Sequence, residues 1–227
     1  MTAVVFDFGG VLFRWEPERL LAELLGARIT PETPARHWMQ QIFQSYGGDW
    51  GDFDRGTVEP AALVPRIARR TGLSEAEVQR VVDAVPHELQ PQPATVALLR
   101  RLHAAGHPLF YLSNMPAPYA THLERTHDFM ALFGDGVFSA RVHHNKPEPA
   151  IFLEAARRID VPPQHCIVFE DAPFGIEAAR RAGMRAVAVC STHSPAQLAG
   201  PHVLAAVRDY TELMNTDFLE TLHAATA

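Results

Sequence analysis

Four short stretches of this sequence carry side chains that can do chemistry. Three directly follow an apolar run, and the fourth, at Lys146, follows a loop after such a run. They supply a carboxylate, a hydroxyl with an amide, an ammonium and an acidic pair, from Asp7, Ser113-Asn114, Lys146 and Glu170-Asp171. A carboxylate that ends an apolar run must be paired, hydrated or bound to a metal ion, because an isolated charge is costly to bury. We therefore ask which elements bring these stretches together.

The apolar runs are short, rich in β-branched and aromatic residues, and bounded by Gly, Pro, Asn or Asp. They predict six strands, each buried on both faces, at residues 3–6, 108–112, 137–139, 166–169, 185–189 and 203–207. Helical patterns lie between them, at residues 94–105, 149–159 and 173–182. This alternation predicts an α/β fold with a doubly wound parallel sheet. Ligands of such a sheet bind beyond the carboxyl ends of its strands, so we expect the four stretches to form one site.

One connection, between Phe6 and Ala94, is much longer than the others. Most of it has an amphipathic helical pattern, at residues 16–25, 33–45, 60–70 and 74–84. Ser74 and Glu77 have the spacing of a capping box, Pro34 suits the first turn of a helix, and we expect Pro86, Pro91 and Pro93 to mark the end of the helical segment. We therefore predict an α/β core of residues 1–15 and 92–227, with residues 16–91 forming an inserted helical cap.

The composition narrows the classes of partner. Of the 227 residues, 47% are hydrophobic, which is enough for a substantial core. The chain has 20 basic and 26 acidic residues and no basic cluster, so we expect neither nucleic acid nor an anionic membrane as a partner. No apolar run exceeds five residues, and Asp7 interrupts the region that a signal peptide would need, so we expect a cytoplasmic protein. We expect Cys166 and Cys190 to be reduced, buried thiols.

In combination, these stretches resemble the haloacid dehalogenase superfamily. Its phosphatases carry an Asp nucleophile after the first strand, Ser or Thr after the second, Lys after the third, and an acidic pair after the fourth. The likeness covers essentially the whole chain, because the helical insertion matches the first-position cap of that superfamily. Within it, the sequence is most similar to bacterial small-molecule phosphatases whose first motif is Asp-x-Gly, including those that act on glucose 1-phosphate.

The resemblance implies a role for each residue. It makes Asp7, Lys146 and Ser113 catalytic: Asp7 attacks phosphorus, and water hydrolyses the resulting aspartyl phosphate. Phosphate would be bound by Ser113, by Lys146 and by amides near Gly9, Gly10 and Asn114. Mg²⁺ would be held by Asp7, the carbonyl of Gly9, Asp171 and Glu170, the last directly or through water.

Gly9 departs from the superfamily pattern, in which a second Asp protonates the leaving group. Its absence argues against a mutase, which needs that proton relay twice. Either the cap or water supplies the acid, with Asp49, Asp52 and Asp54 as cap candidates, or the leaving group needs little help. The second case favours a sugar 1-phosphate, because an anomeric oxygen is a better leaving group than an alkoxide.

The expected function is thus Mg²⁺-dependent hydrolysis of a small phosphomonoester, a sugar phosphate, by a monomer or homodimer. Two alternatives remain open: a metal-independent 2-haloacid dehalogenase that uses Asp7, and a non-catalytic domain of the same fold. Dehalogenases of this superfamily lack the acidic pair that Glu170 and Asp171 form here. We expect the pair His143-His144 to have a loop role, and the aromatic residues of the cap, among them Trp15, to form mainly its core.

Overall fold

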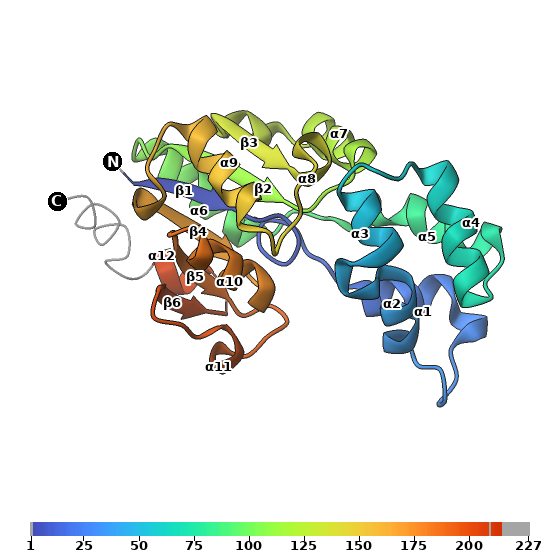
Figure 1. Ribbon diagram of the computed structural model, residues 1–227. Coiled ribbons are helices and arrows are strands. Elements are labelled where there is room, and N and C mark those ends of the chain that lie inside the picture. The colour runs from blue at the N-terminus through green and yellow to red at the C-terminus, as the bar shows by residue number, and fades with distance from the viewer. Residues whose placement is uncertain (1, 209, 215–227) are drawn as a thin grey trace.

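The computed structural model describes residues 2–208 and 210–214 and contains one six-stranded sheet (Figure 1). The strands are β1 (Ala3–Phe6), β2 (Leu109–Ser113), β3 (Asp135–Phe138), β4 (Cys166–Glu170), β5 (Arg185–Val189) and β6 (Val203–Val207). Their order is β3-β2-β1-β4-β5-β6, and each neighbouring pair is parallel. The predicted doubly wound α/β fold is confirmed.

Strand β1 is central, and its register places the chemistry at one edge of the sheet. Its four residues are fully buried, which agrees with their uniformly apolar sequence. Phe6 pairs with Phe169 of β4, and the Asp7 amide donates a 3.1 Å hydrogen bond to the Phe169 carbonyl. Asp7 and Glu170 therefore leave their strands side by side.

Strand β6 does not fit the prediction that every strand is buried on both faces. Its residues alternate between half-buried and exposed positions before the buried Val207, and Leu204 is 39% exposed. The reason is its place at the edge of the sheet, where it pairs only with β5. A continuous apolar run predicted the strand correctly but not its burial.

Helices cover both faces of the sheet, and alternate residues of β1 point to opposite faces. Val4 and Phe6 belong to the apolar cluster that includes α6 (Pro93–Ala104), whereas Ala3 and Val5 pack in the cluster of α9 (Pro149–Ile159) and α10 (Pro173–Arg181). The other helices after the insertion are α7 (Ala117–Thr126), α8 (Ser139–Val142), α11 (Pro195–Leu198) and α12 (Tyr210–Met214).

Five helices of the long insertion lie together beyond one end of the sheet (Figure 1). We call them the helical block: α1 (Pro17–Leu24), α2 (Ala35–Phe43), α3 (Gly48–Asp54), α4 (Pro60–Thr71) and α5 (Glu75–Glu88). The predicted capping box of Ser74 and Glu77 is present at the start of α5. Short 3₁₀ turns occur at Gly26–Arg28, Gln44–Tyr46, Asp128–Leu132 and Pro163–His165. Apolar residues of the block and of one sheet face form a continuous cluster.

Helix α5 corrects the expectation that Pro86 ends the helical pattern, because the helix continues through Pro86 to Glu88. A proline inside a helix leaves the carbonyl four residues earlier without its N–H partner. Here that carbonyl belongs to Val82, and the Tyr119 hydroxyl donates a 2.6 Å hydrogen bond to it. A tertiary contact thus replaces the lost helical bond. Pro34 is the N-cap of α2 and precedes its first turn.

Helix α3 is absent from the sequence-based expectations. Gly47, Gly48 and Gly51 lower the helix propensity of this segment. The helix forms nevertheless, because Trp50 is buried against Phe43 of α2 and Phe53 against Tyr119 of α7. Packing has outweighed intrinsic propensity here.

Two further expectations concern membranes and cysteines. Among the described residues, no helix is both long enough and apolar enough to cross a membrane. Both cysteines are free thiols, with Cys166 buried and Cys190 only half-buried. Burial raises the pKa of the Cys166 thiol to about 11, so this group is a packing residue rather than a reactive thiolate.

Candidate active site

A buried charge cluster lies at the carboxyl edge of the sheet and joins Asp7, Lys146 and Glu170. Lys146 Nζ is 2.8 Å from Asp7 Oδ1 and 2.7 Å from Glu170 Oε2. Burial lowers the pKa of Lys146, but the charges of Asp7 and Glu170 raise it by a larger amount, so the net shift is upward. Lys146 is therefore a permanent cation between two carboxylates.

Strand β2 positions the lysine through Asn114. The Asn114 side chain accepts a 2.8 Å hydrogen bond from the Lys146 amide and donates a 3.2 Å bond to the Lys146 carbonyl. Ser113 is buried and borders the same cavity, and among the described residues its hydroxyl donates only one long hydrogen bond, of 3.5 Å, to the Asn114 carbonyl. The side chain of Asn114 thus fixes the lysine, while the Ser113 hydroxyl is available to a ligand.

Asp7, Glu170 and Asp171 form an acidic cluster whose ligand oxygens all lie within 4.8 Å of one another. Burial and the charge of Asp7 raise the pKa of both Glu170 and Asp171. Within the described part of the chain, only Lys146 balances this charge by a direct ion pair. Three crowded carboxylates against one ammonium fit a divalent cation with oxygen ligands.

Glu170 and Asp171 have different surroundings. Glu170 is fully buried, and besides Lys146 it accepts hydrogen bonds from the amides of Asp171 and Ala172. Gly175 allows this burial, because a Cβ there would lie 2.2 Å from Glu170 Cδ. Asp171 borders the cavity and accepts a 3.0 Å hydrogen bond from the Ser191 hydroxyl. Asp171 is thus the more accessible of these two candidate metal ligands, while Glu170 forms an ion pair with Lys146.

The two glycines after Asp7 also differ. Gly10 has φ +75°, and a Cβ there would lie 2.1 Å from Asp171 Oδ2, so glycine is required for the acid to pack. Its amide donates a 2.8 Å hydrogen bond to the Phe13 carbonyl, so nothing here supports the predicted phosphate contact of the Gly10 amide. Gly9 borders the cavity, and a Cβ there would meet only Trp15, at 3.7 Å.

A cavity of about 710 Å³ separates this edge from the helical block. The core side presents every predicted site residue except Gly10 and Glu170, namely Asp7, Gly9, Ser113, Asn114, Lys146 and Asp171. The opposite wall is largely apolar, with Met39, Tyr46, Trp50, Val85 and Leu89. The Trp15 indole N–H donates a 2.8 Å hydrogen bond to the Tyr46 hydroxyl. Cap aromatics thus also form a wall of the cavity.

The helical block contacts the loop that carries Lys146. The Ser139 hydroxyl donates a 2.5 Å hydrogen bond to the Asp54 carbonyl. The side-chain amide of Asn145 donates a 2.7 Å hydrogen bond to the Gly51 carbonyl. Arg55 forms a 2.7 Å ion pair with Glu148. These contacts therefore fix the position of helix α3 relative to the loop of Lys146.

The histidine pair belongs to this contact and does not border the cavity. His143 Nδ1 lies 3.0 Å from the Arg55 carbonyl, and His144 Nδ1 lies 2.9 Å from Glu148 Oε2. Both side chains are exposed. These contacts agree with the expected loop role.

Sequence reasoning did not assign Ser191 or His193, which both border the cavity. His193 Nδ1 lies 3.1 Å from the Asp171 carbonyl. Both residues follow β5, so the rule that ligands bind beyond the carboxyl ends of strands could have identified them.

Comparison with known proteins places this geometry in a family. A family model described as haloacid dehalogenase-like hydrolase matches residues 1–183. The validoxylamine A 7'-phosphate phosphatase of Streptomyces hygroscopicus subsp. limoneus is 32% identical over 203 residues, which cover 85% of this chain and 94% of that protein. The chain belongs to the haloacid dehalogenase-like hydrolase family, as its motifs predicted.

Other relatives are also named as phosphatases. The sesquiterpene phosphatase astK of Aspergillus oryzae is 28% identical over 186 residues, 80% of this chain and 86% of that protein. The phosphorylated carbohydrates phosphatase of Thermotoga maritima is 26% identical over 199 residues, 82% of this chain and 84% of that protein. The prediction of a phosphoric monoester hydrolase is confirmed.

A solved structure shows the same fold. The family hydrolase from Deinococcus radiodurans R1, solved with bound phosphate and sodium, superposes with a TM-score of 0.67 at 20% identity. The match covers 98% of this chain and 96% of that one. At this identity the likeness concerns the fold alone.

Proposed function

We propose that this protein hydrolyses a small phosphomonoester, a sugar phosphate, with Mg²⁺ and through an aspartyl phosphate on Asp7. The observation that carries the proposal is the position of Lys146, which contacts both Asp7 and Glu170 at hydrogen-bond distance beside the cavity. A buried ammonium beside a nucleophilic carboxylate suits an anionic substrate.

The residues of the chain have distinct tasks in this reaction. Asp7 attacks phosphorus, and Lys146 holds the carboxylate in place while neutralising charge that develops on the phosphoryl oxygens. The Ser113 hydroxyl donates to one of those oxygens, with the amides of Gly9 and Asn114 as further donors. The helical block acts as a cap over the substrate, so that residues 1–15 and 92–227 form the catalytic core.

Asp7, Asp171 and the Gly9 carbonyl would hold the Mg²⁺ ion, with Glu170 behind them, since these oxygens suit a hard cation. The fit rests on the crowding of three carboxylates around a single ammonium. When bound, the ion supplies the positive charge that lets a carboxylate approach a phosphate dianion.

The substrate class follows from the cavity. Its charged core side suits a phosphoryl group, while the aromatic side chains of Trp15 and Tyr46 suit a sugar ring that stacks on them. Relatives named for carbohydrate phosphates support this class. A cytoplasmic location and a monomeric or homodimeric state remain predictions.

The test is a phosphate-release screen over phosphorylated metabolites with and without Mg²⁺, using Asp7→Asn as the control. We expect Mg²⁺-dependent release, fastest with sugar phosphates, and none from the variant. Halide release from a 2-haloacid without added metal would instead support the dehalogenase alternative. An unchanged rate in Asp7→Asn would contradict both.

A further inference from the structure

Asp54 is a buried acid on the wall of the cavity that faces the catalytic core. It is only 3% exposed, yet it borders the same cavity as Asp7 and Lys146. Among the described residues, no side chain or amide forms a hydrogen bond or ion pair with its carboxyl group. An unpaired carboxyl in an apolar wall is costly to keep, so its presence requires a reason beyond packing.

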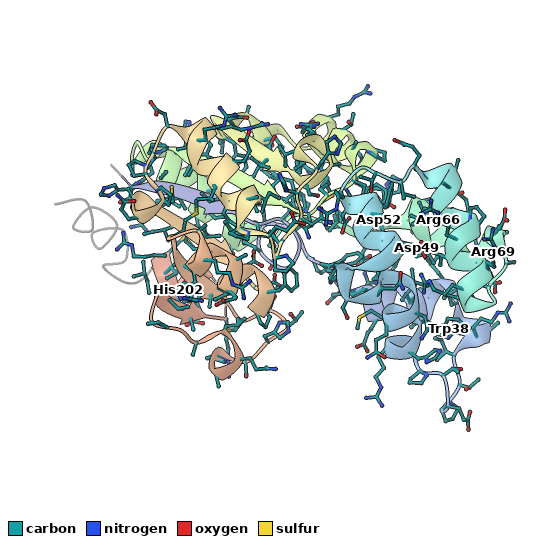
Figure 2. The ribbon with its side chains drawn as sticks, viewed as in Figure 1. Trp38, Asp49, Asp52, Arg66, Arg69 and His202 are labelled. Atoms are coloured by element: carbon teal, nitrogen blue, oxygen red, sulfur yellow. The ribbon has the colours of Figure 1, made fainter. Side chains whose placement is uncertain are left out.

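The other two candidate acids, Asp49 and Asp52, lie on the same helix as Asp54 (Figure 2). Asp49 forms an ion pair with Arg70 at 3.2 Å and lies 3.9 Å from Arg66, so it joins α3 to α4. Asp52 is exposed to solvent. Of the three acids that sequence analysis considered, only Asp54 borders the cavity.

We propose that Asp54 is the general acid and base of this phosphatase, and that it replaces the second Asp that is missing at Gly9. The inference rests on the proposed function, because it assigns the proton donor of that reaction. It is a role for a cap residue, and it explains why the Gly9 position can lack a side chain.

The position of Asp54 is fixed from its main chain. Its carbonyl accepts a hydrogen bond from the Ser139 hydroxyl. The same hydroxyl accepts a 2.8 Å hydrogen bond from the Met115 backbone amide. Ser139 therefore connects Asp54 to the segment directly after Ser113 and Asn114. This coupling leaves the carboxyl group free while holding it opposite the phosphate-binding residues.

The surroundings favour the protonated form of the carboxyl group. Burial raises the pKa of Asp54 well above its usual value, because the apolar wall disfavours the charged form. Tyr46 and Tyr119 are its near titratable neighbours, and the Asp54 charge contributes to raising the pKa of each. From the core, Asp7, Lys146 and Asp171 face the cavity, and Glu16, Glu18, Arg19 and His193 border it elsewhere.

The proton balance has two steps. In the first, an Asp7 oxygen bonds to phosphorus, the ester P–O bond breaks with its electron pair on the leaving oxygen, and Asp54 gives that oxygen its proton. In the second, a water oxygen bonds to phosphorus while Asp54 carboxylate takes one of its protons. The bond from phosphorus to Asp7 breaks, which restores both carboxyl groups and releases phosphate.

The experiment compares two kinds of ester in Asp54→Asn. A 4-nitrophenyl leaving group departs without protonation, whereas an alkyl leaving group needs the acid. We expect kcat/KM for glycerol 1-phosphate to fall by about 10²- to 10³-fold and that for 4-nitrophenyl phosphate by less than about 10-fold. The matched control is Asp52→Asn, on the same helix but exposed, with rates within about 2-fold of the parent for both esters.

A rescue variant makes the test independent of folding losses. A Cβ at Gly9 has ordinary contact distances and no positive φ, so Gly9→Asp is sterically allowed. Added to Asp54→Asn, it should restore at least about 10-fold of the lost alkyl-ester rate, as a carboxyl group near the leaving oxygen would. Gly9→Ala in the same background should restore none.

Three results would overturn the proposal. An equal loss for both esters in Asp54→Asn would mean that Asp54 only supports the structure. No loss for either, or an alkyl-selective loss in His193→Gln instead, would place the acid elsewhere. A parent enzyme that released phosphate from none of the screened phosphomonoesters would instead contradict the proposed function, on which this assignment rests.

Discussion

The sheet edge and the helical block contribute to one cavity in opposite ways. At the edge, charged groups contact one another: Lys146 joins Asp7 to Glu170, and Asp171 lies beside them. In the block, Asp54 faces the cavity from an apolar wall, with no ion pair among the described residues. The edge is thus a dense set of charges, and the block presents an isolated acid.

This difference separates two parts of the reaction. The edge sits at strand ends that the sheet holds rigidly, which suits bond formation at phosphorus. The block holds its acid on a helix that contacts the core through polar bonds and through the ring contact of Phe53 with Tyr119. This position suits recognition and release of the leaving group. We therefore expect edge substitutions to affect every ester and block substitutions to depend on the ester.

The largest effect is expected at the edge, from Asp7→Asn. The amide is a poor nucleophile but has the same shape, so phosphate release should fall by at least about 10⁴-fold with every ester. The measurement is steady-state phosphate release at saturating substrate, with thermal unfolding to show that the variant is folded. A loss confined to alkyl esters would contradict the expectation that edge substitutions affect every ester.

Lys146→Met should give the next largest effect. It leaves buried carboxylates without their ammonium, so we expect about 10²- to 10³-fold lower kcat for both ester kinds and a loss of about 3–5 kcal/mol in unfolding free energy. Urea unfolding at neutral pH measures the second quantity. Added Mg²⁺ should recover part of the stability, and a variant as stable as the parent would contradict the charge balance described here.

Chelation tests the acidic cluster itself. Removal of divalent ions should lower activity by at least about 10²-fold and lower the melting temperature, because an ion that binds only the folded state stabilises it by mass action. Mg²⁺ should reverse both changes. In Asp171→Asn, which removes a ligand, the Mg²⁺-dependent rise in melting temperature should shrink; a rise equal to that of the parent would exclude Asp171 as a ligand.

How much of this was visible in the sequence differs between the two regions. The edge was predictable, since Asp7, Ser113 and Glu170 follow apolar runs and parallel strands bring their carboxyl ends together. In the block, the glycines of α3 prevented its prediction as a helix. The sequence therefore could not show which of Asp49, Asp52 and Asp54 lies on the buried face. With the helix known, Trp50, Phe53 and Asp54 share one face at spacings of three and four residues, which marks Asp54 as an acid on an apolar face.

The pH dependence of the melting temperature of Asp54→Asn tests the contrast between the sheet edge and the helical block without an activity measurement. Since burial raises the pKa of Asp54, the parent loses stability as pH rises above about 4, the usual value for the unfolded chain, until the buried group has ionised. The variant lacks this loss. Its melting temperature should exceed that of the parent by at least about 2 °C at pH 8 and by less at pH 5.

Identical differences at both pH values would mean that the pKa of Asp54 is not raised well above its usual value in the folded protein. Asp52→Asn serves again as the control, because Asp52 is exposed and its ionisation costs the folded state little. It should show no pH-dependent difference.

The smallest effect is expected where the two regions meet. Arg55 and Glu148 are each about one-third exposed, so their ion pair should contribute no more than about 1 kcal/mol. Arg55→Gln should therefore change kcat/KM less than about 5-fold, for both ester kinds alike. A large alkyl-selective loss would show that this pair, rather than the Ser139 contact, positions Asp54.

The most direct test of the central claim is to trap the covalent intermediate. Enzyme quenched in acid during turnover of a phosphomonoester should carry one phosphoryl group in the peptide that contains Asp7, and hydroxylamine should release it. Asp7→Asn should carry none, and Asp54→Asn should accumulate more than the parent if water attack is slowed. Rapid turnover without any phosphoryl group on Asp7, or with one on another residue, would contradict the account.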